Sequence, residues 1–227
     1  MHLLAIAVLL AAPVAAEDVL QVKFAKKDPV LSADPKSKFW KGIAPVLATK
    51  NNLGVETPGH RTEIRTRWTA ANLYVLMSCP YEDLYLIPNP VTAAETNKLW
   101  EHDAAELFIG ADFDKINRYR EYQVSPQGEW VDLDIDTKQA LPEGGWKWNS
   151  GMKVKAQIDQ KAKIWYGEFQ IPLVSITDKP VKAGTEMRGN FYRFQGPPPN
   201  RKSVAWVQTG RPSNHTPEKF AKILFVK

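Results

Sequence analysis

The sequence predicts an all-β fold, an antiparallel β-sandwich of the immunoglobulin-like or jelly-roll type with long loops. In most candidate elements the apolar residues alternate with a period of two rather than 3.6, which is typical of half-buried strands. The chain contains 17 prolines, which interrupt any long amphipathic helix. Short candidate strands recur at the close spacing expected of a sandwich.

The chain begins with a candidate secretory signal at residues 1–16. Residues 3–10 form an apolar run, and Val14 and Ala16 satisfy the small-residue rule for cleavage before Glu17. A buried first strand or helix is the alternative interpretation of the same run. We expect a signal peptide at residues 1–16 and a single domain at residues 17–227, which would be secreted or periplasmic.

Two hairpins are predicted in the first part of this domain. Residues 61–68 and 73–78 are joined by a short turn at residues 69–72. Residues 119–125 and 129–136 are joined at residues 126–128, where Gly128 supplies the positive φ that a tight turn often needs. Between the two hairpins, residues 106–110 form another apolar strand.

The clearest half-buried strand is at residues 152–159, where Met152, Val154, Ala156 and Ile158 share one face. Long loops are expected at residues 89–97 and 196–200. Antiparallel pairing is expected throughout. The remaining strands are predicted at residues 164–171, 189–195, 203–207 and 222–226.

The composition excludes several classes of protein. The net charge is +5 with a pI of about 9.1, basic and acidic residues are interleaved, and no nucleic-acid motif occurs, so we expect no nucleic-acid partner. Nothing after the candidate signal approaches the roughly 18 apolar residues of a membrane span. Cys79 is the single cysteine, so we expect a buried, inert thiol. Phosphate-loop, nucleophile-elbow and zinc-protease motifs do not occur.

Two groups of carboxylates bear on metal binding and catalysis. The three aspartates of residues 132–136 imitate a calcium loop without its glycine, so we expect a solvated strand face and no metal site. Glu101, Asp103 and Glu106 lie close enough in sequence for glycoside hydrolysis to be considered. No second carboxylate cluster is identifiable to face them across a cleft. We therefore predict a non-catalytic protein.

The chain contains eight tryptophans, and they fall into different settings. Trp165 and Trp206 lie within apolar strands and are expected in the core. Trp146 and Trp148 are expected to form either an exposed platform or a lid over a sheet edge. Trp100 adjoins an acidic segment, and an indole beside carboxylates suits sugar recognition because the C–H face of a sugar packs on the ring. The alternative, that Trp100 only caps the core, stays open.

Several short motifs follow one another between about residue 60 and residue 227. They lie at residues 67–75 (RWTAANLYV), 99–109 (LWEHDAAELFI), 121–125 (EYQVS), 165–172 (WYGEFQIP), 189–193 (GNFYR), 205–206 (AW) and 215–220 (HTPEKF). In this order they resemble the family 9 carbohydrate-binding modules of the DOMON-like superfamily. The resemblance implies a β-sandwich that binds carbohydrate without catalysis, in carbohydrate catabolism and in association with glycoside hydrolases.

The resemblance also implies the residues of the site. Modules of this family hold the end of a sugar chain between two tryptophans, and Trp100 matches the first of them. Glu106 matches the closing glutamate of the motif that begins at Trp100. Gln123 falls where a sugar-binding member has an arginine, and Arg193 falls near a polar binding position.

The second tryptophan of the family falls at about Asn214 in this sequence. The second aromatic wall is therefore missing, and His215, Trp146 or Trp148 could replace it. The expected ligand-binding residues are Trp100, Glu106, Gln123, Arg193 and His215.

Two other functions stay open. A haem-binding electron-transfer domain is one, since related sandwiches carry haem, and its candidate ligands are Met77, Met152, Met187, His102 and His215. A protein-interaction scaffold without a small ligand is the other, and it predicts that Trp100 is buried. We expect a carbohydrate partner, a monomer and no resident cofactor, with a structural calcium ion left open.

Overall fold

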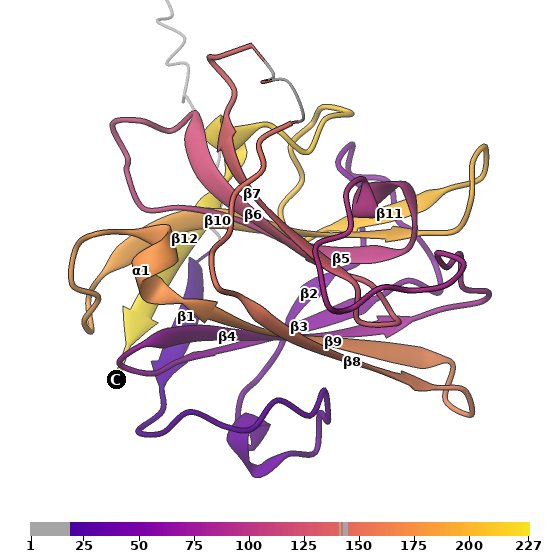
Figure 1. The fold of residues 1–227 in the computed structure, drawn as a ribbon, viewed down its shortest axis with the longest axis horizontal. Helices are drawn as coiled ribbons and strands as arrows, with labels where there is room; N and C mark the ends of the chain where they lie inside the picture. The colour runs from indigo at the N-terminus through magenta and orange to yellow at the C-terminus, as the bar shows by residue number, and fades with distance from the viewer. Residues whose placement is uncertain (1–18, 141, 143–144) are drawn as a thin grey trace, which may run out of the picture.

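The computed structural model describes residues 19–140, 142 and 145–227, and this part of the chain is an all-β structure (Figure 1). The predicted signal segment lies outside the described residues. The strands are β1 (Val19–Phe24), β2 (Val46–Ala48), β3 (Thr62–Trp68), β4 (Asn72–Pro80), β5 (Ala104–Gly110), β6 (Arg118–Val124), β7 (Trp130–Asp136), β8 (Lys153–Asp159), β9 (Ile164–Pro172), β10 (Glu186–Gln195), β11 (Lys202–Ala205) and β12 (Ala221–Val226).

Helical structure is limited to short turns in the described residues. One α-helical turn, α1 (Leu173–Ile176), follows β9, and 3-10 turns lie at η1 (Lys38–Trp40), η2 (Leu99–Glu101) and η3 (Pro217–Lys219). Within the described ranges, no helix has the length and apolar character needed to cross a membrane.

Hydrogen bonds join the strands into one sheet that folds over into two facing layers (Figure 1). The strand order is β7-β6-β5-β10-β12-β1-β3-β4-β9-β8, with β11 beside β10 and β2 beside β3. Strands β12 and β1 connect the layers on one side, and β7 and β8 are the free ends on the other. The result is a nearly closed sandwich, which confirms the predicted all-β fold.

The two predicted hairpins are confirmed. In the β3–β4 hairpin Trp68 lies opposite Leu73, and in the β6–β7 hairpin Val124 lies opposite Trp130. Gly128, in the second turn, has the positive φ of 92° that its place in the sequence predicted. Both hairpins therefore have the short connection that the sequence predicted.

Strand β1 corrects the expectation of purely antiparallel pairing. It lies parallel to both neighbours, with Leu20 opposite Ile223 of β12 and Lys23 opposite Arg67 of β3. Neither neighbour is joined to β1 by a hairpin turn, so no local connection forces the antiparallel direction. The sheet is therefore mixed, although most of its pairs are antiparallel.

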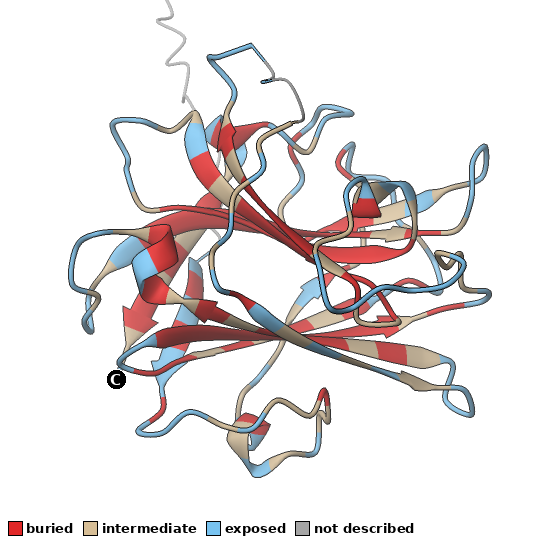
Figure 2. Cartoon of the chain, viewed as in Figure 1, coloured by how far each residue is buried: buried red, intermediate tan, exposed pale blue. Residues whose placement is uncertain are grey.

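The main apolar core lies between the two layers, and Figure 2 shows many buried residues on the strands of both layers. Trp165 and Trp206 both belong to this core, as predicted. Cys79 is also fully buried there, and burial raises the pKa of its thiol to about 12, so the thiol stays protonated and inert.

The outer face of β4 and β9 is covered by the segment that follows β1, which contains Ser32, Ala33 and Trp40. We call it the covering segment. Trp40 packs there on Tyr74 and Leu76. Glu168 of β9 accepts hydrogen bonds from the backbone N–H groups of Ser32 and Ala33, each at 2.8 Å, and from Trp40 Nε1 at 2.9 Å. These donors hold the covering segment in place and satisfy both oxygens of a buried carboxylate.

Candidate functional site

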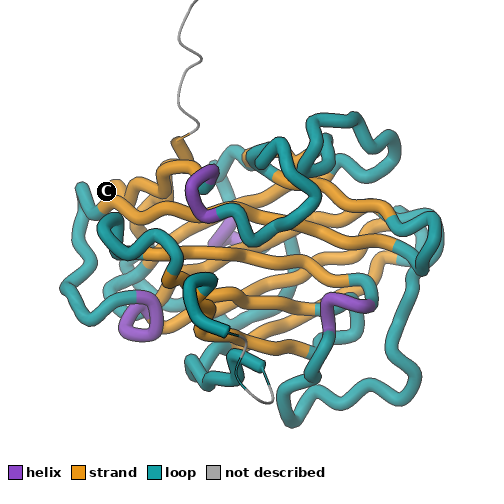
Figure 3. Tube along the Cα trace, turned by 90° about the horizontal axis from the view of Figure 1, so that it is seen from above, coloured by secondary structure: helices purple, strands orange, loops and turns teal. Residues whose placement is uncertain are grey.

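The opposite outer face, on strands β5, β6 and β10, carries polar side chains. The strand register places Glu106 opposite both Gln123 and Tyr192, so these side chains share one face. Phe108 and Glu121 lie opposite each other on the same face. We call the surface defined by Glu106, Phe108, Glu121, Gln123 and Tyr192 the outer polar face. Figure 3 looks down on the molecule and shows loops crossing over the strands.

A second apolar cluster, separate from the main core, lies on the same side of the sheet as the outer polar face and shares Phe108 and Tyr192 with it. Alternate residues of the same strands, such as Leu107 and Tyr122, point the other way into the main core. Trp100 and Trp146 pack against the second cluster and remain only partly buried. Its buried members are Leu99, Ala104, Phe108, Tyr119, Val131, Leu133, Ile135, Tyr192 and Ala205. Two tryptophans therefore reach the rim of a surface with a polar centre.

The polar centre holds hydrogen-bond acceptors that the protein does not satisfy. Glu106, Glu121 and Gln123 are 1%, 3% and 0% exposed. Nε2 of Gln123 donates to Oε1 of Glu121, and Nδ2 of Asn214 donates to Oε2 of Glu106 at 3.4 Å. Glu106 Oε1, Glu121 Oε2 and Gln123 Oε1 are buried, and none of the described residues donates to them. Because buried acceptors are normally matched, this arrangement suits a ligand that brings donors.

The two glutamates strongly influence one another. Burial raises the pKa of Glu106 well above its ordinary value, and the Glu121 carboxylate raises it further. Burial also raises the pKa of Glu121 to about 7, against the hydrogen bond from Gln123, which lowers it. Two neighbouring buried carboxyls cannot both ionise without a large cost, so the pair retains a proton near neutral pH.

Arg201 positions the turn that carries Trp100. Its guanidinium donates to the backbone oxygens of Trp100 at 2.5 Å, Glu101 at 2.6 Å and His102 at 2.6 Å. The same charge lowers the pKa of Glu106. Trp100 itself is intermediate in exposure, so the buried Trp100 expected for a scaffold without a ligand is not observed. Its ring is held at the rim of the outer polar face.

The loop before η3 brings His215 to the outer polar face. Nδ1 of His215 lies 2.6 Å from the Tyr119 hydroxyl, and its ring centroid lies 5.2 Å from that of Phe108. The rings of Trp146 and His215 are 6.4 Å apart. Burial of the imidazole lowers the pKa of His215, so the ring is neutral near pH 7. Trp148 is not part of this group, since it packs on Arg120 and Tyr122.

Asn214 is tied to the same face. The Tyr192 hydroxyl donates to the backbone oxygen of Asn214 at 3.0 Å, and Asn190 Nδ2 donates to the Tyr192 hydroxyl at 2.9 Å. Asn52 Nδ2 donates to the side-chain oxygen of Asn214. An amide therefore stands over Glu106 at the position where the resemblance predicts a second tryptophan.

Four of the five predicted site residues come together in the structure. Glu106, Gln123 and His215 meet on the outer polar face, and Trp100 lies at its rim. Arg193 does not join them, because it lies opposite Ala105 and points into the main core. There it is buried and donates to the backbone oxygen of Pro80 at 2.5 Å. A shift of one residue along a strand reverses the face, and the site side of β10 carries Tyr192 instead.

The acidic residues considered for metal binding and catalysis have structural partners. Asp132 is buried rather than solvated, and it accepts hydrogen bonds from the backbone N–H at 3.0 Å and the hydroxyl of Ser150. Asp103 is also buried and accepts from the backbone N–H groups of Tyr85 at 3.0 Å and Gly196 at 2.6 Å. In the ranges that the structure describes, no group of three His, Cys, Asp or Glu side chains could hold a metal ion.

The candidate haem ligands do not converge on one site. Met77, Met152 and Met187 lie in the main core between the layers. His215 lies on the outer polar face, and His102 stacks on Tyr85 with ring centroids 4.8 Å apart. The structure offers no pair of these residues across a common cavity among its described residues.

Sequence reasoning missed Glu121, Tyr192 and Arg201 as parts of the site. A signal for Glu121 was present, since alternation along residues 119–125 places it on the same face as Gln123. Tyr192 and Arg201 carry no comparable signal, because their roles depend on the β5–β10 register and on the fold of the loop that precedes β11.

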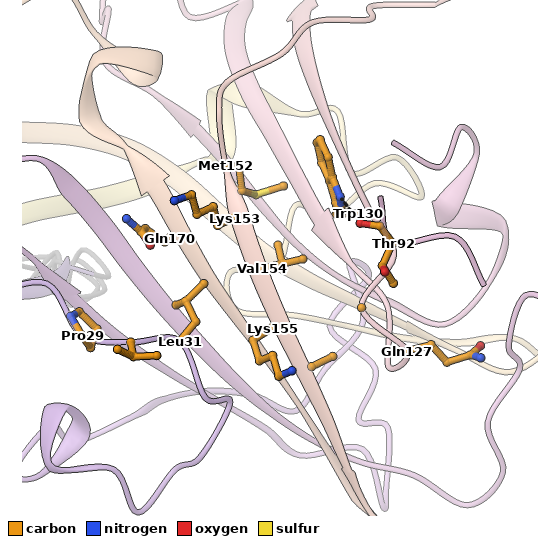
Figure 4. Close-up of a pocket in the computed structure, with 13 residues that line it drawn as sticks. Pro29, Leu31, Thr92, Gln127, Trp130, Met152, Lys153, Val154, Lys155 and Gln170 are labelled. Carbon is orange, nitrogen blue, oxygen red and sulfur yellow. Dashed lines mark hydrogen bonds between the residues drawn. The ribbon is translucent and has the colours of Figure 1, made fainter. Parts of the chain in front are cut away.

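A cavity of about 750 Å³ lies elsewhere, along β8 (Figure 4). Leu31 of the covering segment lines one part of it, Met152 and Val154 line its middle, and Trp130 and Gln127 line the other part. Trp130 packs against the main core rather than the second cluster. This groove is therefore separate from the outer polar face.

The sequence profile of one family, described as "Carbohydrate family 9 binding domain-like", matches residues 35–224. Among solved structures, the chain is similar to a protein of Bacteroides uniformis ATCC 8492 provisionally described as carbohydrate-binding. The identity is 18% and the TM-score 0.74, over 92% of this chain and 100% of that one.

The chain is also similar to a carbohydrate-binding module family 9 domain from Caldicellulosiruptor kristjanssonii. In its complex with cellotriose the identity is 15% and the TM-score 0.64, over 92% of this chain and 94% of that one. In its complex with glucose the identity is 14% and the TM-score 0.63, over 90% of this chain and 95% of that one. No curated protein sequence matches this chain significantly. The match over most of its length shows that the chain belongs to the carbohydrate family 9 binding domain-like family.

Proposed function

We propose that this chain is an exported, non-catalytic carbohydrate-binding domain that holds a sugar, or the end of a glycan, on the outer polar face. The observation that carries the proposal is the meeting of unmatched buried acceptors with the rim tryptophans Trp100 and Trp146. Sugar hydroxyls bring the donors that these acceptors lack, and the indole rings offer apolar surface to the C–H face of a sugar.

Access to the acceptors depends on Asn214. Its amide is bound to Glu106 by a long hydrogen bond of 3.4 Å, which a sugar hydroxyl can replace with a shorter one. The bound sugars of the Caldicellulosiruptor kristjanssonii domain, cellotriose and glucose, support a glucose-type ligand for this chain. A role in carbohydrate catabolism is part of the same proposal.

Export is part of the proposal, and its support is the apolar run and small-residue cleavage pattern of residues 1–16. Expression of the whole chain in a bacterial host, followed by mass determination of the product, tests it. A product that begins at Glu17 outside the cytoplasm is expected. A cytoplasmic product that retains Met1–Ala16 would contradict it.

Isothermal titration of the purified protein with glucose and cellotriose tests the binding function. We expect Trp100→Ala to weaken binding at least about tenfold, with an unchanged fold by circular dichroism. Trp130→Ala is the matched control, because Trp130 is a partly exposed tryptophan in the groove along β8. Equal affinities of wild type and Trp100→Ala would remove the outer polar face from the binding site.

A further inference from the structure

The three unmatched acceptors lie within reach of one small group. Glu106 and Gln123 are directly opposite in the β5–β6 register, and Glu121 is hydrogen-bonded to Gln123. Directly opposite residues of antiparallel strands have Cβ atoms about 5 Å apart. The register therefore brings the side chains that carry Glu106 Oε1, Glu121 Oε2 and Gln123 Oε1 to neighbouring positions on one face.

The groups that face these acceptors do not neutralise them. Arg201 acts on Glu106, but its hydrogen bonds go to backbone oxygens of the Trp100 turn. Burial lowers the pKa of His215, which disfavours its charged form. The hydroxyls of Tyr119 and Tyr192 are already engaged by His215 and by the backbone of Asn214.

We propose that the outer polar face selects a sugar with a protonated amino group, such as a glucosamine unit, over the neutral sugar of the same shape. The inference rests on the proposed carbohydrate-binding function and names its ligand class. An ammonium group has three N–H donors for the three oxygens and a positive charge for the carboxyl pair. A neutral hydroxyl donates one hydrogen bond and brings no charge that would stabilise an ionised carboxyl.

A divalent metal ion fits the same place less well. Calcium takes about six to eight oxygen ligands, and most come from carboxylates and carbonyls that the protein supplies. Among the described residues, no group of three Asp, Glu, His or Cys side chains is placed so that it could hold a metal ion. Two carboxyls and one amide oxygen suit an ammonium group, which needs only three acceptors.

Binding of the ammonium group moves one proton. In the free protein at about pH 6, Glu121 is largely protonated, since its pKa is about 7, and the raised pKa of Glu106 favours the protonated form of that carboxyl as well. When the ammonium group arrives, the O–H bond of the carboxyl breaks and the proton passes to the buffer. The new carboxylate then accepts an N–H of the ligand, so total charge and protons balance. Neutral sugars should release far less.

The test is isothermal titration of the whole purified protein at about pH 6 with glucosamine, glucose and N-acetylglucosamine. We expect glucosamine to bind at least about tenfold more tightly than the other two. Repeating the titration in buffers of different ionisation enthalpy measures the released protons. We expect close to one proton for glucosamine and almost none for glucose. This comparison uses the unaltered protein, so it does not depend on the folding of any variant.

Glu121→Gln keeps the shape of the side chain and removes its charge. We expect this variant to lose the preference for glucosamine and the proton release. Glu186→Gln is the matched control, since Glu186 is exposed at the start of β10 and pairs with Lys222 at 3.5 Å. The control should keep the full preference.

The outcomes separate this inference from the proposed function. If glucose binds and glucosamine binds no more tightly, the charge preference is wrong and the carbohydrate-binding function stands. If a folded protein binds none of the three sugars and no cellotriose, the function itself is wrong. If calcium binds in a titration with calcium chloride and displaces glucosamine, the carboxyl pair is a metal-ion site, and the inference is overturned.

Discussion

On the outer face of β4 and β9, the oxygens of Glu168 accept hydrogen bonds from Ser32, Ala33 and Trp40. On the outer face of β5 and β6, Glu106 and Glu121 are as deeply buried, and each keeps an oxygen without a protein donor. Loops cover both faces, and each face belongs to strands in the middle of its layer. The difference teaches that burial alone does not mark a binding site, whereas unmatched polar atoms do.

The outer face of β4 and β9 should tolerate substitution least. Glu168→Ala leaves two backbone N–H groups and an indole N–H without their acceptor, so we expect a loss of about 3 kcal/mol or more in unfolding free energy. Urea unfolding measures it. Glu168→Gln should cost less because one oxygen remains. A loss below about 1 kcal/mol for Glu168→Ala would erase the contrast between the two faces.

The rim of the outer polar face should show the opposite behaviour. Trp100→Ala removes a partly exposed ring that packs against the second cluster, so we expect a change in unfolding free energy below about 1 kcal/mol. The affinity for cellotriose should fall at least tenfold, which is about 1.4 kcal/mol of binding free energy. A large loss of stability together with unchanged affinity would make Trp100 a core cap.

The carboxyl pair should make stability fall as pH rises. The folded-state pKa values of Glu106 and Glu121 lie above the unfolded value of about 4.3, so the folded protein binds more protons than the unfolded chain above that pH. Their contribution is therefore fully present below about pH 4, and it declines as pH rises through about 7 for Glu121.

Glu121→Gln removes one of the two charges and should flatten this decline. We expect the variant to gain about 1 kcal/mol relative to wild type at pH 8, and little at pH 5. Urea unfolding of both proteins across this pH range gives the comparison. Parallel pH profiles for the two proteins would show that the glutamates do not share a buried site.

The groove along β8 should give the smallest effect. Trp130→Ala alters a wall of the cavity without touching the outer polar face, so sugar affinity should stay within about twofold of wild type. Titration with cellotriose checks this. A loss comparable to that of Trp100→Ala would place the ligand in the groove instead.

Most of the fold could be predicted, because it depends on local signals. The hairpin at Gly128 follows from its turn, and the strand that contains Val154 follows from alternation. The parallel placement of β1 could not be predicted, since Leu20 meets Ile223 at the far end of the chain. No turn or short connection encodes that contact.

The site was predictable only in part, for a related reason. Trp100 and Glu106 lie in one continuous motif, so the resemblance located both. Glu121 becomes a partner of Glu106 only through the β5–β6 register, which no tight turn fixes. Arg193 shows how sensitive this is, because a change of one residue along β10 separates the main core from the site.

The most direct test of the account is to map the sugar by two-dimensional ¹H–¹⁵N NMR on the uniformly labelled protein. The account predicts that glucose or glucosamine shifts the backbone amides around Trp100, Glu106, Gln123 and His215. Amides around Glu168 should stay unchanged. Shifts centred on β9 or on the groove along β8, or no shifts at saturating sugar, would contradict the claim that unmatched acceptors mark the binding face.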